Sequence, residues 1–222
     1  AESAESDRAF LAAIGSFEVG FWERANNEFG EFLKNFPDSS KVGRAVLLQA
    51  QCRFMLKDYA SVASLLAANS AKAGDLADQF LYWQGEAQFY QDYYAKAAMF
   101  YEELLASHPK SPLRLEASYG RAWATYKLNQ ADRAIELLTD PTGGFQIASQ
   151  TSTNETKIVE GNLLLADVLL TRKRFRETEA VLEELGKRAL RPEQNFDRLY
   201  LLASSTFADL RTDEALARVT NL

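Results

Sequence analysis

The sequence predicts an all-α protein, an α-solenoid of about six antiparallel helix pairs. Strand signals are nearly absent from its 222 residues, and apolar residues recur at spacings of three and four, the periodicity of an α-helix. Five prolines and eleven glycines are few for a loop-rich or disordered chain. A short turn followed by a compact residue also returns at regular intervals along the chain, which indicates a repeat architecture.

Each predicted turn is followed by a small or compact residue, which we call the anchor of its repeat. The anchors, at successive intervals of 37, 35, 37, 44 and 37, are Ala25, Val62, Ala97, Ala134, Thr178 and Ala215. Four positions after each anchor stands a large apolar residue: Phe29, Leu66, Tyr101, Leu138, Leu182 and Val219. Two antiparallel helices approach closely near their turn, so a small residue is needed there, and the large residue fills the space one turn later. Stacked pairs then bury a continuous core that no single pair could form.

The first two repeats show how a pair begins and ends. In the first, Pro37 follows the anchor by twelve positions and ends the second helix, because proline cannot continue it. In the second, residues 45–56 place apolar side chains on one helical face. Cys52 lies on that face, and we expect it to be a buried structural thiol.

The third repeat is the best formed. Residues 80–101 hold nine aromatic residues in 22, with Gly85 and Ala97 as the predicted close-packing points and 91–93 as the turn. Pro109 ends the second helix. Five of the rings are expected to pack within the repeat or against its neighbours: Phe80, Trp83, Tyr94, Phe100 and Tyr101.

The longest interval, 44, places an insertion between the fourth and fifth repeats. Residues 138–144 stop a helix early, and residues 145–156 are polar and rich in Ser and Thr. We therefore expect a polar loop over 140–152, either a plain mobile connector or a hinge. It would separate helix pairs one to four, 6–139, from pairs five and six, 153–222.

The last helix, from about Asp213 to Leu222, is short for the polar cap that a solenoid needs at its end. We therefore expect the parent protein to continue beyond it.

The composition disfavours several classes of function. A net charge of −6 and a pI of about 5.0 are unlike the basic stripe of a nucleic-acid-binding protein. No apolar run approaches the ~18 residues that a transmembrane helix requires. Cys52 is the one cysteine and His108 the one histidine, so we expect no disulfide framework, no metal site and no cofactor. The motifs of phosphate-binding loops, dinucleotide folds, zinc proteases and serine hydrolases are missing too, and we expect no enzyme activity.

The third repeat carries a known pattern over residues 81–109. Gly85, Ala97, Tyr101 and Pro109 stand at the spacing of an A-x3-F…P pattern. In this they resemble the tetratricopeptide repeat, whose period is about 34 residues. The resemblance covers about 6–220 and implies a right-handed α-solenoid. It also implies that the first helix of each pair lines a concave groove.

In repeats of this kind, the groove-facing positions lie about 18, 15, 11, 8 and 7 before each anchor. For repeats two to four this count predicts the following partner-binding residues: Arg44, Gln51, Phe54, Tyr82, Glu86, Phe89, Tyr90, Tyr119, Trp123 and Lys127. An aromatic floor with a few polar groups suits a bound peptide or protein segment. The other interpretation is that these rings only pack the interior of the solenoid.

A narrower resemblance rests on residues 31–47 and 82–128, which share a Pro-x-Ser module after a helix. Both segments are similar to bacterial envelope repeat proteins, such as the coordinator of the Tol–Pal system and the repeat lipoprotein of the outer-membrane assembly machine. This resemblance implies a periplasmic or cell-envelope scaffold in a membrane-associated complex, with the cytoplasm as the other location.

The functional hypothesis is a non-catalytic scaffold for protein–protein interaction. Two alternatives stay open: the recruiting or regulatory half of an enzyme whose catalytic domain lies outside these residues, and a solenoid that binds a small molecule or lipid. The sequence leaves the partner and the oligomeric state open.

Overall fold

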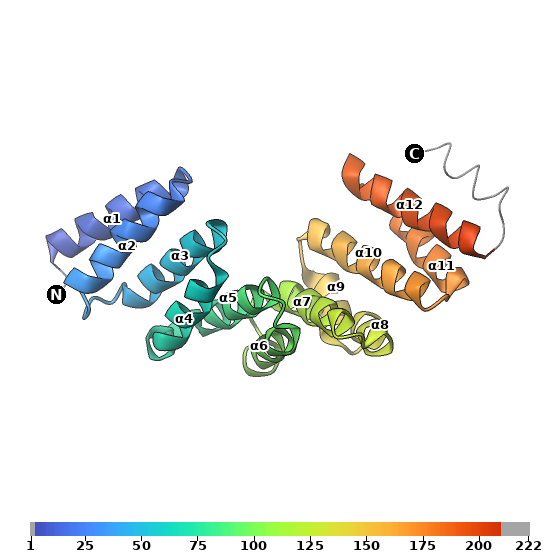
Figure 1. Ribbon diagram of the computed structural model, residues 1–222, viewed down its shortest axis with the longest axis horizontal. Coiled ribbons are helices and arrows are strands. Elements are labelled where there is room, and N and C mark those ends of the chain that lie inside the picture. Colours follow the sequence, from blue (N-terminus) through green and yellow to red (C-terminus); the bar gives the residue numbers. More distant parts are fainter. Residues whose placement is uncertain (1–2, 210–222) are drawn as a thin grey trace. The chain divides into compact units, whose positions relative to one another are not determined.

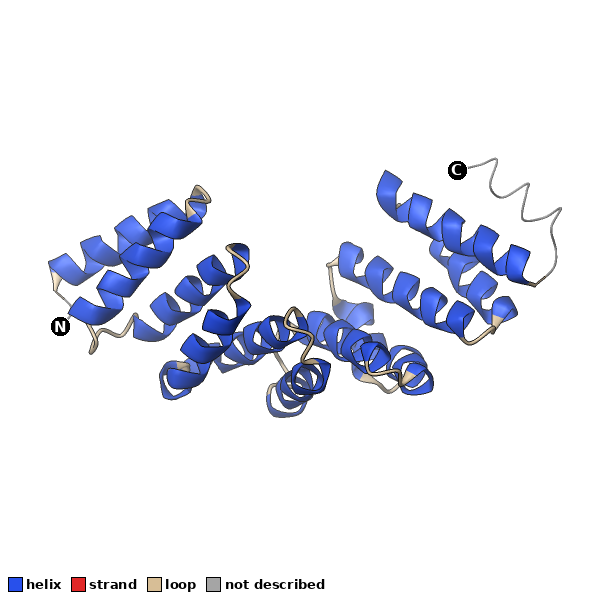
Figure 2. Cartoon of the chain, viewed as in Figure 1, coloured by secondary structure: helices blue, strands red, loops and turns tan. Residues whose placement is uncertain are grey.

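The computed structural model describes residues 3–209, which form twelve α-helices and two short 3-10 turns joined by loops (Figures 1 and 2). Consecutive helices pack as antiparallel pairs, which confirms the all-α prediction. The chain divides into two compact units, Ala1–Leu113 and Arg114–Leu222. Each unit has a hydrophobic core of its own.

Unit 1 contains three helix pairs, with the two 3-10 turns, Ser70–Lys72 and Gly74–Leu76, before the third. Its pairs are α1 (Ala4–Glu18) with α2 (Trp22–Asn35), α3 (Val42–Met55) with α4 (Tyr59–Ala68), and α5 (Ala77–Phe89) with α6 (Tyr94–Ser107).

Unit 2 contains two complete pairs, one intervening helix and the first helix of a third pair. Its helices are α7 (Arg114–Lys127), α8 (Ala131–Thr139), α9 (Gly144–Thr151), α10 (Glu155–Thr171), α11 (Phe175–Leu185) and α12 (Pro192–Ala208). The predicted last helix, with the anchor Ala215 and the apolar Val219, lies outside the described residues.

The backbone confirms the predicted repeat register in five repeats. The residue five positions before each anchor has a left-handed backbone, with φ between 58° and 79°: Gly20, Lys57, Asp92, Asn129 and Lys173. This conformation ends the first helix of a pair and starts the turn. The five anchors that follow are fully buried, with 0% of each residue exposed: Ala25, Val62, Ala97, Ala134 and Thr178. Sequence spacing therefore located the turn inside each of these five helix pairs.

Gly85 is a point of close helix packing, as predicted. A Cβ atom at this position would lie 2.6 Å from Cε1 of Tyr101 on α6. Tyr101 is 1% exposed, and its hydroxyl donates a hydrogen bond of 2.6 Å to the carboxylate of Glu86. Burial, and then the negative charge of Glu86, raise the pKa of Tyr101 well above its usual value. The glycine thus lets α5 and α6 approach until this phenol is enclosed between them.

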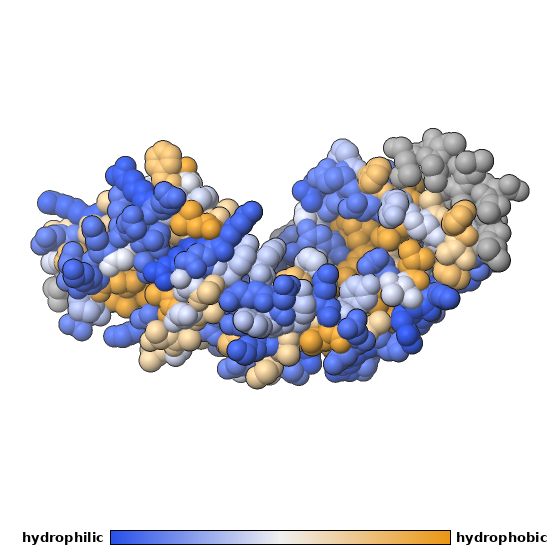
Figure 3. Space-filling view, in the orientation of Figure 1, coloured by the Kyte–Doolittle hydropathy of each residue, from blue (hydrophilic) through white to orange (hydrophobic). Residues whose placement is uncertain are grey.

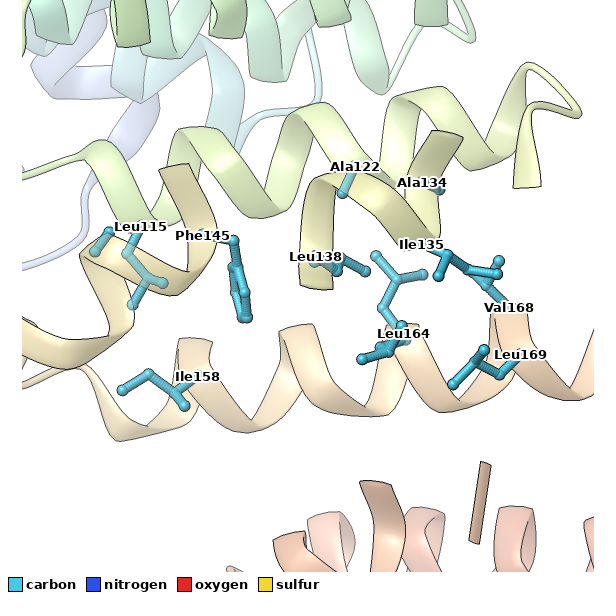
Figure 4. Close-up of a cluster of buried hydrophobic side chains, with 12 residues drawn as sticks. Leu115, Ala122, Ala134, Ile135, Leu138, Phe145, Ile158, Leu164, Val168 and Leu169 are labelled. Atoms are coloured by element: carbon cyan, nitrogen blue, oxygen red, sulfur yellow. The ribbon is translucent and has the colours of Figure 1, made fainter. Parts of the chain in front are cut away.

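The predicted polar loop at 140–152 is wrong, because most of the segment forms helix α9. Phe145 on α9 is 2% exposed and points toward α10 in the unit 2 core (Figure 4). A Cβ atom at Gly161 on α10 would lie 2.2 Å from Cζ of the Phe145 ring, so the glycine makes room for the ring. The Ser/Thr-rich sequence conceals this one apolar side of α9, which Phe145 and Ala148 form.

Asn154 is the N-cap residue of the next helix, α10. Its side-chain oxygen accepts a hydrogen bond of 3.1 Å from the backbone N–H of Lys157. Helix α9 packs against α7 and α8 within unit 2. The boundary between the compact units accordingly lies at 113/114, and a hinge at 140–152 stays a prediction.

The one cysteine and the one histidine of the chain are Cys52 and His108. Cys52 is fully buried, and burial raises the pKa of its thiol to about 11, so it is a structural side chain. His108 is the C-cap residue of α6, where its backbone N–H donates to the carbonyl of Leu104. Among the described helices, none is long and apolar enough to cross a membrane.

Candidate functional site

The ten predicted partner-binding residues are divided between the two units. Seven lie in unit 1: Arg44, Gln51, Phe54, Tyr82, Glu86, Phe89 and Tyr90. Tyr119, Trp123 and Lys127 lie on α7 in unit 2. The two sets have different surroundings.

In unit 1 the predicted rings mainly contact one another. Tyr90 stacks on Tyr59, with ring centroids 5.1 Å apart and an angle of 25° between the planes. The centroid of the Phe54 ring lies 5.3 Å from that of Tyr90 and 5.0 Å from that of Trp83. Tyr90 is 50% exposed, so one edge of this aromatic cluster reaches the surface. We call Phe54, Tyr59, Trp83 and Tyr90 the unit 1 aromatic cluster.

Other predicted residues of unit 1 are already engaged inside the unit. Phe89 is only 9% exposed and packs 5.2 Å from Tyr94. The prediction that Phe89 faces an open groove is therefore wrong, and the residue belongs to the core. The reason is that α6 folds back over the last turn of α5. Tyr82 contacts the rings of Trp83 and Tyr101.

Two of the polar residues predicted in unit 1 contact aromatic side chains of the same unit. Glu86 accepts the Tyr101 hydroxyl, and the exposed Arg44 lies over the Phe10 ring at 5.8 Å. Gln51 is partly buried on α3. A hollow of unit 1, about 600 Å³ in volume, lies instead at the chain start and the α2–α3 turn, lined mainly by small polar residues such as Ser6 and Ser39.

Unit 2 has an open groove of about 360 Å³ between α7, α10 and α12. We call it the unit 2 groove. It is lined by Tyr119, Trp123, Glu160, Leu163, Leu164, Asp167, Asp197, Tyr200 and Leu201. Tyr119 and Trp123 were predicted, and their rings lie 5.6 Å apart on successive turns of α7. Apolar residues gather over α10 on the face of unit 2 seen in Figure 3.

The charged side chains that line the groove are all acidic: Glu160, Asp167 and Asp197. Lys157 stands beside them, and its ammonium group pairs with Glu160 at 2.6 Å and lies 4.5 Å from the centroid of the Tyr119 ring. Burial raises the pKa of Asp167, although a hydrogen bond from Tyr126 and the charge of Lys127 act in the opposite direction. Lys127 is exposed and outside the lining.

Sequence reasoning missed seven of the nine groove residues, although a signal for five of them was present. The first three groove-facing positions before Thr178 are Glu160, Leu163 and Asp167, and the first two before Ala215 are Asp197 and Tyr200. All five line the groove. The count predicted binding residues only for repeats two to four, and its extension to the degenerate repeats five and six finds these five.

Chemical groups for catalysis are sparse in residues 3–209. No group of three or more His, Cys, Asp or Glu side chains lies close enough there to hold a metal ion. The arrangement of rings and carboxylates can supply contact area, cation binding and hydrogen-bond acceptors.

Comparison with known proteins agrees with this geometry. Residues 79–111, the third repeat, match the tetratricopeptide repeat family. The chain has the tetratricopeptide repeat fold. That fold is typical of proteins that bind other proteins, and proteins built from it are generally non-catalytic.

Several solved structures share the fold at low sequence identity. Pseudomonas aeruginosa pilF has a TM-score of 0.72 at 14% identity, covering 98% of this chain and 90% of its own. MamA RS-1, solved as an ArsTM double mutant, has a TM-score of 0.69 at 12% identity, covering 84% and 96%. YrrB, a tetratricopeptide repeat protein with an unusual peptide-binding site, has 0.61 at 14%, covering 86% and 89%. No curated protein matches the chain.

Proposed function

We propose that the protein is a non-catalytic scaffold that binds a peptide or protein segment in the unit 2 groove. The observation that carries the proposal is the open groove between α7, α10 and α12, in which Tyr119, Trp123 and Tyr200 surround apolar side chains. Tyrosine and tryptophan provide a large contact area at a small cost in side-chain entropy, which is why they dominate binding hot spots.

The size of the groove suits a short segment. Its volume of about 360 Å³ lies near the lower end of the ~300–1,000 Å³ usual for ligand pockets. A few side chains of a partner would fill it, with the flanking residues of the partner in solvent. Tyr200 is 58% exposed, so its ring is available without a rearrangement of α12.

The unit 1 aromatic cluster is a weaker candidate, although the sequence favoured it. Its rings already contact one another, with Tyr59 stacked on Tyr90. A ligand would gain little binding free energy from these rings, because most of their surface is already buried in the unbound protein.

The experiment is a selection of random twelve-residue peptides displayed on phage against the full chain, followed by calorimetry with the selected peptides. We expect Trp123→Ala to weaken their binding by about 2 kcal/mol, a usual hot-spot loss. Tyr90→Ala removes an exposed ring of unit 1 and serves as the matched control, with affinity unchanged. Equal binding to wild type and Trp123→Ala, each folded by circular dichroism, would place the binding surface elsewhere.

We also propose a periplasmic or cell-envelope location, supported by the resemblance of residues 31–47 and 82–128 to envelope repeat proteins. Fractionation of the source cells, followed by immunoblotting, tests it. Recovery only with cytoplasmic markers would contradict it.

A further inference from the structure

The acidic residues of the unit 2 groove follow the repeat register. Glu160 and Asp167 are seven positions apart on α10, which places them on one side of the helix about 10 Å apart. Leu163 lies between them on the groove wall. Asp197, on α12, occupies the same repeat position as Glu160 when each is counted back from its own anchor. The groove therefore has carboxylates on two of its three helices, with apolar surface between them.

The described residues neutralise this charge only in part. Lys157 pairs with Glu160, and Lys127 is the cation that acts on Asp167. No described cation forms an ion pair with Asp197. None of the nine lining residues is Lys or Arg. The groove as a whole therefore presents negative potential next to the exposed ring of Tyr200 and the partly buried rings of Tyr119 and Trp123.

Lys157 already shows how a cation is accommodated here. Its ammonium group lies 4.5 Å from the Tyr119 ring centroid while it contacts a carboxylate of the same groove at 2.6 Å. The face of an aromatic ring attracts a cation, and a nearby carboxylate adds to the attraction. The rest of the lining also contains both kinds of group, the rings of Trp123 and Tyr200 and the carboxylates of Asp167 and Asp197.

We infer that the occupant of the unit 2 groove is a basic segment of a partner protein, in which Arg or Lys side chains alternate with apolar ones. Its cations would lie against the carboxylates and ring faces, and its apolar side chains against Leu163 and Leu201. Arginine suits the site best, since its planar guanidinium both stacks on rings and hydrogen-bonds to carboxylates. This inference rests on the proposed function of the same groove. It excludes an acidic segment or a C-terminal carboxylate as the occupant.

The test uses the peptides selected on the full chain. We expect Arg and Lys to be enriched among them, and replacement of these residues by Gln to lower affinity at least tenfold. Asp167→Asn and Asp197→Asn should each weaken binding about fivefold. Glu184→Gln is the matched control, because this exposed carboxylate lies on α11, outside the groove lining, and should leave affinity unchanged. Binding should also weaken as NaCl is added, because salt screens exposed charges.

The outcomes separate this inference from the proposed function. Peptides that lose affinity with Trp123→Ala but show no basic enrichment, and bind Asp197→Asn as tightly as wild type, would overturn the inference and leave the groove as a binding site. A selection that yields no peptide dependent on Trp123 would overturn both. Asn is nearly isosteric with Asp, so both variants should stay folded. Their melting temperatures will distinguish a loss of affinity from unfolding.

Discussion

The two units place residues of the same repeat position in opposite chemical surroundings. At the groove-facing position farthest from the anchor, unit 1 has Arg44, which lies over a phenylalanine ring, whereas unit 2 has the groove carboxylates Glu160 and Asp197. The rings differ as well. Those of unit 1 pack on one another around Phe54, whereas those of unit 2 surround an open groove. A repeat register thus determines where a side chain lies, and its neighbours decide whether it is core or binding surface.

The largest expected effect on stability comes from substitutions that disturb the close helix packing inside each unit. Gly161→Ala should destabilise unit 2 by about 3 kcal/mol, because overpacked cores relax poorly and the new methyl group overlaps the Phe145 ring. Gly85→Ala should act similarly on unit 1 through Tyr101. Gly15→Ala on α1 has no atom within 4 Å of the added carbon and should instead stabilise by up to about 1 kcal/mol.

Urea unfolding measures these changes, and Cys52 reports on unit 1 alone. Burial raises the pKa of this thiol to about 11, so a thiol reagent at mildly alkaline pH should label it only when unit 1 opens. Labelling should become faster in Gly85→Ala and stay unchanged in Gly161→Ala. Equal acceleration in both variants would mean that the units unfold together.

The second effect tests whether the unit 1 rings are structural. Phe54→Ala should lower the free energy of unfolding by about 2 kcal/mol, less than the loss of a fully buried ring would. The reason is that Phe54 is partly buried among three other rings. Peptide binding to the unit 2 groove should stay at the wild-type level.

Met99→Ala is the control for this change, because it removes a side chain that is 68% exposed. It should change stability by less than about 0.5 kcal/mol. Loss of binding in folded Phe54→Ala would show that the cluster takes part in recognition.

The third effect concerns the turns and should be alike in the two units. Lys57 and Lys173 have left-handed backbones, a conformation that costs a residue with a Cβ atom about 1 kcal/mol. Lys57→Gly and Lys173→Gly should therefore each stabilise the protein by about 0.5–1 kcal/mol. Asn129→Gly is the control. Because asparagine already tolerates the left-handed conformation, this substitution should stabilise the protein less. Thermal unfolding measures the changes, and a loss of stability in both lysine variants would contradict the assignment of the turns.

The smallest effect relates stability to function in unit 2. Burial raises the pKa of Asp167 above its usual value of 3.8, so folding disfavours the ionised carboxylate. The stability contribution of Asp167 is therefore greatest below that usual value and is lost as the pH rises through the raised pKa. Asp167→Asn should melt at a slightly higher temperature than wild type at neutral pH, and this advantage should vanish near pH 3. A lower melting temperature at neutral pH would contradict this account.

Much of the fold could be predicted because repeats share local rules. Each described turn lies five positions before its anchor, and each anchor is buried. Close helix packing beside the turn requires a compact residue five positions after the left-handed turn residue. Helix α9 could not be predicted in this way. Its buried side consists of Phe145 and Ala148 in a mainly polar stretch whose Ile147 is exposed, and only the space beside Gly161 makes that side a core surface.

The candidate site was predicted in part. Tyr119 and Trp123, which the sequence predicted to bind a partner, line the unit 2 groove, and their binding role stays a prediction. The same count extended to the later repeats reaches Glu160, Asp167 and Asp197. Phe89 was misplaced because its burial depends on the ring of Tyr94 on the next helix. Position in the repeat carries no information about such a neighbour.

The sequence by itself determined that this protein is all-α, where its helix pairs turn and that α5 and α6 approach closely at Gly85, because these features depend on local spacing. Only the tertiary structure decided which aromatic rings pack on one another and which line an open groove. That outcome depends on how neighbouring pairs stack. In unit 1 the rings of adjacent pairs contact one another, and half of Tyr90 stays exposed. In unit 2 the side chains of α7, α10 and α12 leave a groove with three carboxylates in its wall.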